Sequence, residues 1–235
     1  MRSDALPNAS AGRPGASGEP VRARFASVVL DVDSTLSGVE GIDWLASLRG
    51  PAMAARIAEL TDRAMRGEIT LESVYGERLR MISPTRREIE ALAIRYVEAI
   101  APGAETVIEA LRSAGVSIAV VSGGLREAIV PLARMVGAEG DALSAVSIRF
   151  DLDGRYVGFD EQSPLATQGG KERVVRELAL PAPVLGVGDG ATDLAMRPAV
   201  AAFGAYVGFV RRDPVVRAAD FTIESFAQLA ELVLG

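Results

Sequence analysis

Short apolar runs without polar alternation recur along the chain and predict buried parallel strands. They cover residues 25–31 (FASVVLD), 116–122 (VSIAVVS), 183–189 (PVLGVGD) and, more weakly, 199–205 (AVAAFGA). A strand that is buried on both faces of a parallel sheet has no polar face, so its side chains do not alternate. The pattern therefore predicts a sheet that is covered on both sides.

Helical patterns fill the stretches between these runs. Residues 102–115 begin at a proline and end at a glycine, and residues 171–180 repeat their apolar positions at helical spacing. Proline suits the first turn of a helix, and glycine suits the position just after the last turn. Strands and helices that alternate in this way predict an α/β fold with a doubly wound, Rossmann-like parallel sheet.

Two segments depart from the alternation. Residues 39–100 contain consecutive helical patterns, one of them opened by a capping box from Thr85 to Glu88, and they predict a helical insert directly after the first strand. Residues 146–159 predict two strands around an Asp-Gly pair, the dipeptide typical of a tight hairpin. The expected organisation is a core of residues 23–38 and 101–235, a cap of residues 39–100, and a tail of residues 1–22 that is rich in Gly, Pro, Ala and Ser and predicted to be disordered.

Composition excludes several classes of protein. The 235 residues are 49% hydrophobic, which is enough for a core, and 25 basic against 31 acidic residues leave no basic face for nucleic acid. No apolar run approaches the roughly 20 residues that span a bilayer, and no secretory signal is visible, so we expect a cytoplasmic protein without a membrane partner. The chain has no cysteine and no histidine, which leaves acid–base chemistry to carboxylates and lysine.

Polar residues of distinct kinds follow the predicted strands. The first strand is followed by Asp31, Asp33 and Thr35, the second by Ser122, Gly123 and Gly124, and the third by Asp189, Thr192 and Asp193, while Lys171 stands at the start of a helix. Ligands bind at the carboxyl ends of the strands in open parallel sheets, so we expect these groups to meet at one edge.

The chemistry of this edge indicates a metal and a phosphoryl group. Clustered carboxylates repel one another unless a cation lies among them, and an all-oxygen donor set favours Mg²⁺ over Ca²⁺ or Mn²⁺. The glycine pair allows backbone N–H groups to face an anion, and a lysine adds positive charge. One aspartate can then attack phosphorus while the second, two residues on, transfers protons.

The motifs DVDST, SGG, the lysine and GDGATD, in this order, resemble those of the haloacid dehalogenase superfamily of phosphohydrolases, and the insert resembles its C1-type cap. Five longer stretches, DVDSTLSGVEGIDWLA, TDRAMRGEITLESVYGERLRMISP, VVSGGLREAI, GFDEQSPLATQGGK and GDGATDLAM, resemble the phosphoserine phosphatase family within it. The resemblance covers the chain beyond the tail. It implies Mg²⁺-dependent hydrolysis of O-phospho-L-serine through an aspartyl phosphate, the last step of serine biosynthesis.

The resemblance also implies a role for individual residues. Asp31 would be the nucleophile, Asp33 the general acid and base, and Lys171 the third catalytic residue. Glu40 would bind the substrate ammonium and Arg78 its carboxylate, and the other substrate-binding residues would be Thr35, Ser122, Gly123, Gly124, Thr192 and Met65. The metal ligands would be Asp31, the backbone carbonyl of Asp33, and Asp189, with Asp193 in support. Leu71 departs from the family, which often has phenylalanine there.

Other functions remain open. The same chemistry can act on another small phosphate ester or transfer the phosphoryl group to an alcohol. A phospho-accepting receiver domain also gathers aspartates, a hydroxyl and a lysine around Mg²⁺, although a cap over its aspartate would serve no purpose. Residues 186–191 fit a loose dinucleotide fingerprint, but Asp189 would lie where the pyrophosphate binds. The sequence leaves open whether the protein is a homodimer.

Overall fold

The structure is a computed structural model that describes residues 23–65 and 69–235, so the predicted tail lies outside the described residues. Its centre is a six-stranded sheet in the order β3-β2-β1-β6-β7-β8, and every neighbouring pair is parallel. The strands are β1 (Ser27–Leu30), β2 (Ser117–Leu125), β3 (Leu143–Val146), β6 (Val184–Gly188), β7 (Ala202–Tyr206) and β8 (Phe221–Ile223). Strand β1 lies in the middle of the sheet, β2 and β3 follow on one side of it, and β6, β7 and β8 follow on the other. This order confirms the doubly wound α/β fold.

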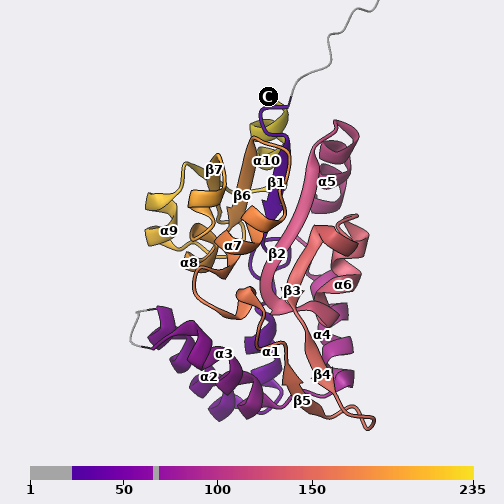
Figure 1. Cartoon of the computed structure of the whole chain (residues 1–235), viewed down its shortest axis with the longest axis vertical. Helices are drawn as coiled ribbons and strands as arrows, with labels where there is room; N and C mark the ends of the chain where they lie inside the picture. Colours follow the sequence, from indigo (N-terminus) through magenta and orange to yellow (C-terminus); the bar gives the residue numbers. More distant parts are fainter. Residues whose placement is uncertain (1–22, 66–68) are drawn as a thin grey trace, which may run out of the picture.

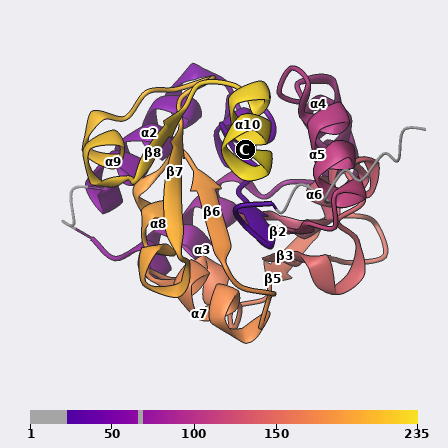
Figure 2. The ribbon, with the colours of Figure 1, turned by 90° about the horizontal axis from the view of Figure 1, so that it is seen from above.

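Helices cover both faces of the sheet, as the non-alternating strands require. Strand β1 is buried along its whole length. Figure 2 shows α10 and α7 on opposite faces, with α5 on the same side as α10. The helices of the core are α5 (Ala104–Ser113), α6 (Arg126–Met135), α7 (Gly170–Glu177), α8 (Ala191–Leu194), α9 (Asp213–Ala218) and α10 (Phe226–Leu234). Short 3-10 turns occur at η1 (Gly140–Ala142), η2 (Pro164–Ala166) and η3 (Arg197–Ala199). No helix in the described ranges is long and apolar enough to cross a membrane.

The insert after β1 is helical, as the sequence predicted. It contains α1 (Gly41–Ser47), α2 (Pro51–Met65), α3 (Leu71–Ile82) and α4 (Arg86–Glu98). Figure 1 shows α1, α2 and α3 in the part of the molecule beyond the end of the sheet, whereas α4 lies beside α6 of the core. The last helix of the insert is therefore anchored differently from the other three.

The predicted hairpin is also present and lies against the insert. Strands β4 (Ile148–Phe150) and β5 (Tyr156–Phe159) are antiparallel, and Gly154 in the connecting turn has a positive φ of 77°. Glycine adopts this conformation without steric cost, which explains the Asp-Gly signal. The ring of Phe159 packs on Tyr75 of α3 with 5.2 Å between ring centroids. The hairpin thus supports the insert from one side.

The start of α4 is held by a capping box and an arginine. Thr85 Oγ1 accepts a hydrogen bond from the N–H of Glu88 at 3.3 Å, and Glu88 Oε2 accepts one from the N–H of Thr85 at 2.8 Å. Arg49, which follows α1, donates to both carboxylate oxygens of Glu88 at 2.6 and 2.7 Å. The hydrogen bond from Arg49 lowers the pKa of Glu88 to about 2. The ionised carboxylate therefore ties the end of α1 to the start of α4.

The substitution Glu88→Gln tests this tie, because glutamine can still close a capping box but carries no charge. A carboxylate whose folded pKa lies below its ordinary 4.5 stabilises the fold above that pH and loses its effect as the pH falls toward 2. We expect the free energy of unfolding at pH 7 to drop by about 1 kcal/mol, since the pair is partly exposed, and the difference to shrink below pH 4.5. Urea unfolding at several pH values measures it, with the exposed Glu90→Gln as control. A difference that does not change with pH would contradict the prediction.

Candidate active site

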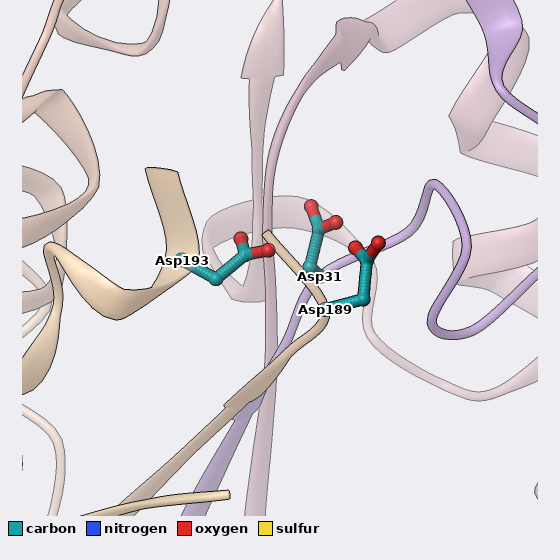
Figure 3. Close-up of side chains that lie close together, drawn as sticks. All are labelled: Asp31, Asp189 and Asp193. Atoms are coloured by element: carbon teal, nitrogen blue, oxygen red, sulfur yellow. The ribbon is translucent and has the colours of Figure 1, made fainter. Parts of the chain in front are cut away.

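The sheet places two aspartates side by side because they follow adjacent strands. Leu30 of β1 pairs with Val187 of β6, and the N–H of Asp31 donates to the carbonyl of Val187 at 3.0 Å. Asp31 therefore lies next to Asp189, and α8 adds Asp193 from its first turn. Figure 3 shows Asp31 and Asp189 side by side with Asp193 pointing toward Asp31. One oxygen from each carboxylate lies within 4.8 Å of the others, and all three residues are buried.

Glycines make this close approach possible. A Cβ on Gly188 would collide with the carboxylate of Asp193. Asp193 Oδ2 also accepts a hydrogen bond of 2.8 Å from the N–H of Gly190. The glycines of the GDGATD motif thus let the carboxylate at the start of α8 lie directly on the end of β6.

Lys171 is the buried counter-ion of the cluster. Its Nζ donates to Asp31 Oδ1 at 2.6 Å and to Asp193 Oδ1, and its side chain is only 7% exposed. Burial lowers the pKa of Lys171, but Asp193 and Asp31 outweigh burial and raise that pKa above its ordinary value. Gly170 brings the start of α7 against the carbonyl of Pro164, where a Cβ would collide. The lysine is therefore charged and fixed in place.

One lysine does not neutralise the cluster. Burial, followed by the charge of Asp193, raises the pKa of Asp31 to about 7, and burial with Asp193 and Asp31 raises the pKa of Asp189 to about 8. Burial and then Glu40 and Asp31 also raise the pKa of Asp33 well above its usual range. Such raised pKa values mean that the carboxylates need a further cation nearby to stay ionised at neutral pH. The all-oxygen donor set fits a hard divalent metal ion.

Arg212 is a residue of the site that the sequence analysis missed. It lies in the loop between β7 and α9, where its Nη1 donates to Asp189 Oδ2 and its Nη2 donates to Glu40 Oε1 at 3.4 Å. Glu40 Oε1 also accepts a hydrogen bond of 2.7 Å from Ser34 Oγ. The only available signal was position, because the loop follows β7, the neighbour of β6.

Most of the predicted site residues line one cavity. Those that line it are Asp31, Asp33, Glu40, Arg78, Ser122, Gly123, Gly124, Lys171, Asp189, Thr192 and Asp193. Thr35 is not among the residues that line the cavity; it is fully buried, and its Oγ1 has no hydrogen-bond partner among the described residues. The side chain of Met65 lies outside the described residues. The strand ends and the insert thus supply opposite walls.

The wall formed by the insert contains a buried arginine. Arg78 of α3 is 8% exposed, and its Nη1 donates to Thr61 Oγ1 at 3.0 Å. Its Nε is buried and has no hydrogen-bond partner within the described part of the chain. Tyr75, also on α3, donates from its hydroxyl to the carbonyl of Gly123 at 2.7 Å and so ties this wall to the end of β2. A buried guanidinium with an unsatisfied N–H is a binding point for an anion.

The parallel sheet, the helical insert and the aspartate cluster are those of a haloacid dehalogenase-like hydrolase, and residues 28–197 match that family. The chain is 34% identical over 208 residues to a chloroplastic phosphoserine phosphatase from Arabidopsis thaliana, covering 86% of this chain and 70% of that protein. It is 33% identical over 206 residues to phosphoserine phosphatase from Homo sapiens, covering 86% and 91%. The crystal structure of a phosphoserine phosphohydrolase-like protein from Francisella tularensis matches with a TM-score of 0.78 at 25% identity, covering 88% of this chain and 98% of that one. The chain belongs to the phosphoserine phosphatase family of the haloacid dehalogenase-like hydrolases.

The guanidinium of Arg212 donates to Oδ2 of Asp189, one of the carboxylates expected to hold the metal ion. In Arg212→Met the guanidinium is gone, so we expect the dissociation constant for Mg²⁺ to fall by a few-fold, since a partly exposed ion pair contributes about 0.2–1 kcal/mol. Isothermal titration calorimetry measures the constant without reference to turnover. Arg211→Met is the matched control, because this neighbour pairs with Asp213 at 3.1 Å and carries the same charge. Equal metal affinity in both variants would contradict a specific competition at Asp189.

Proposed function

We propose that the protein hydrolyses O-phospho-L-serine to L-serine and phosphate, the last step of serine biosynthesis, with Mg²⁺ as its cofactor. The observation that carries the proposal is the distribution of charge around one cavity. An acidic cluster with Lys171 lies on the core wall, and Glu40 and the buried Arg78 lie on the insert side. The substrate has a phosphate, an ammonium and a carboxylate, and each finds a complementary group here. The relatives named as phosphoserine phosphatases support this substrate.

In the proposed reaction Asp31 is the nucleophile. Its carboxylate attacks phosphorus, the bond from phosphorus to the serine oxygen breaks, and the carboxyl group of Asp33 gives its proton to that oxygen. In the second step Asp33 takes a proton from the water that hydrolyses the aspartyl phosphate. Splitting the reaction in this way replaces one difficult displacement by two easier ones. The raised pKa of Asp33 suits a group that must hold a proton before the first step.

The remaining core residues hold the phosphoryl group and its charge. Mg²⁺, bound by Asp31, the backbone carbonyl of Asp33 and Asp189 with support from Asp193, would supply positive charge to the phosphoryl oxygens. Lys171, which donates to Asp31 and Asp193, contributes a second positive charge. Ser122, the glycine pair after it and Thr192 line the cavity where the phosphoryl oxygens would lie. We assign Thr35 to the support of the loop that follows β1, because it is fully buried and its N–H donates to the carbonyl of Val32 at 3.2 Å.

The insert is proposed to close over the substrate. Helices α1 to α3 bear Arg78 and the Tyr75 contact to Gly123, so their closure would exclude water from the phosphoryl group and their opening would release serine. A homodimer and a cytoplasmic location stay predictions. One relative is named as chloroplastic.

Phosphate release from O-phospho-L-serine tests the activity directly. We expect release by the purified protein with Mg²⁺, none with a chelator, and none from the variant Asp31→Asn, because its amide cannot act as the nucleophile. If the protein cleaves an aryl phosphate but not phosphoserine, the substrate is another small phosphate ester. No Mg²⁺-dependent release from either compound would contradict the proposal.

The substitution Arg78→Ala tests how the substrate carboxylate is bound. Loss of a charged hydrogen bond costs about 1.5–3 kcal/mol, so kcat/KM for phosphoserine should fall by roughly 10- to 100-fold. An aryl phosphate has no carboxylate at this position and should be cleaved almost normally. Arg80→Ala, on the exposed side of the same helix, is the matched control. An equal fall in kcat/KM for both substrates would show that Arg78 does not bind the substrate carboxylate.

A further inference from the structure

The side chain of Asp33 is held by a residue that belongs to none of the sequence motifs. Tyr96, on the last turns of α4, donates from its hydroxyl to Asp33 Oδ1 at 2.6 Å. Its side chain is completely buried, with an exposed fraction of 0%. The two residues are 63 positions apart in the sequence. Nothing in the pattern of α4 distinguishes Tyr96 from an ordinary core residue.

The surroundings leave room for the hydroxyl group. A Cβ on Gly41 would collide with the Tyr96 oxygen, and a Cβ on Gly124 would lie 3.4 Å from it. Ser37 Oγ donates to the backbone carbonyl of Tyr96 at 3.0 Å and fixes this turn of the helix. The phenol therefore lies between two segments of the chain, at Gly41 and at Gly124, and a side chain at Gly41 would displace its hydroxyl.

Both protein donors to the Asp33 side chain reach the same oxygen. The N–H of Gly41 lies 3.4 Å from Oδ1, the atom that also accepts the Tyr96 hydroxyl. These two donors occupy Oδ1, so Oδ2 is the oxygen of this carboxyl group that has no donor among the described residues. The two hydrogen bonds thereby fix the orientation of the carboxyl group and leave Oδ2 as its free oxygen.

We propose that Tyr96 is a positioning residue for acid–base catalysis: by holding Oδ1 of Asp33, it directs Oδ2 to the leaving oxygen of the substrate. The inference rests on the proposed function, in which Asp33 protonates that oxygen. Helix α4 packs along α6, so Tyr96 belongs to the part of the insert that is joined to the core. Asp33 Oδ1 is therefore held by the Tyr96 hydroxyl from α4 and by the N–H of Gly41 at the start of α1.

The variant Tyr96→Phe keeps the ring and removes only the donor. We expect kcat for phosphoserine to fall about 10-fold or more, with little change in KM. This loss is smaller than the roughly 10²- to 10⁴-fold that general acid–base catalysis contributes, because the acid itself is still present. Rapid-quench measurement should show slower formation of the aspartyl phosphate from phosphoserine and an unchanged rate from p-nitrophenyl phosphate, whose phenolate leaves without a proton. A general loosening of the fold would slow both, and equal slowing would overturn the proposal. Tyr156→Phe, on the hairpin, is the matched control.

A double-mutant cycle shows whether Tyr96 acts through Asp33. In the background Asp33→Asn, Tyr96→Phe should cause no further loss on phosphoserine, and a full additional loss would overturn the proposal. Gly41→Ala, which displaces the hydroxyl while keeping the tyrosine, should reproduce the dependence on the leaving group if Tyr96→Phe folds poorly. If the proposed function itself is wrong, the wild-type protein will not cleave phosphoserine. This result differs from failure of the Tyr96 proposal, in which the wild-type protein is active and the variants do not behave as expected.

Discussion

The rest of the site depends on the repulsion among buried carboxylates. Three of them converge within 4.8 Å at the ends of adjacent strands, and burial raises the pKa values of Asp31 and Asp189 above neutrality or close to it. Parallel strands bring them there, and the absent side chain of Gly188 lets Asp193 approach. Lys171 and Arg212 then reach in from α7 and from the loop after β7 to offset part of the charge. Such a centre favours binding of cations and of anions bridged by them.

The pattern of hydrogen bonds differs among the carboxylates and matches the proposed division of labour. Asp193 has both oxygens bound, Oδ1 by Lys171 and Oδ2 by the N–H of Gly190, which suits a supporting role. Asp33 has its donors on Oδ1, so its other oxygen is the one that can exchange a proton. A similar set of carboxylates thus obtains different chemical properties from different neighbours.

Much of this arrangement could be predicted from the sequence because its causes are local. The non-alternating strands, the Asp-Gly turn and the capping box of Thr85 and Glu88 each follow from a few neighbouring residues, and the family motifs mark the strand ends. Strands β3 and β8 were not predicted: they are the two edge strands of the sheet, and neither lies in one of the continuous apolar runs that marked the central strands. Arg212 and Tyr96 were missed for a related reason. Their partners lie 172 and 63 positions away, and no short motif records such a contact.

The helices of the insert fall into two groups that contact the core differently, and the sequence does not distinguish them. Helices α1 to α3 stand beyond the sheet and touch the core through contacts such as the Tyr75 hydroxyl on Gly123 and the hydrogen bond from the N–H of Gln168 to Glu72. Helix α4 instead packs along α6, and its tyrosine reaches the side chain of Asp33. In the proposed closure of α1 to α3, the hydrogen bond from Tyr96 would hold Asp33 from the helix of the insert that packs on the core.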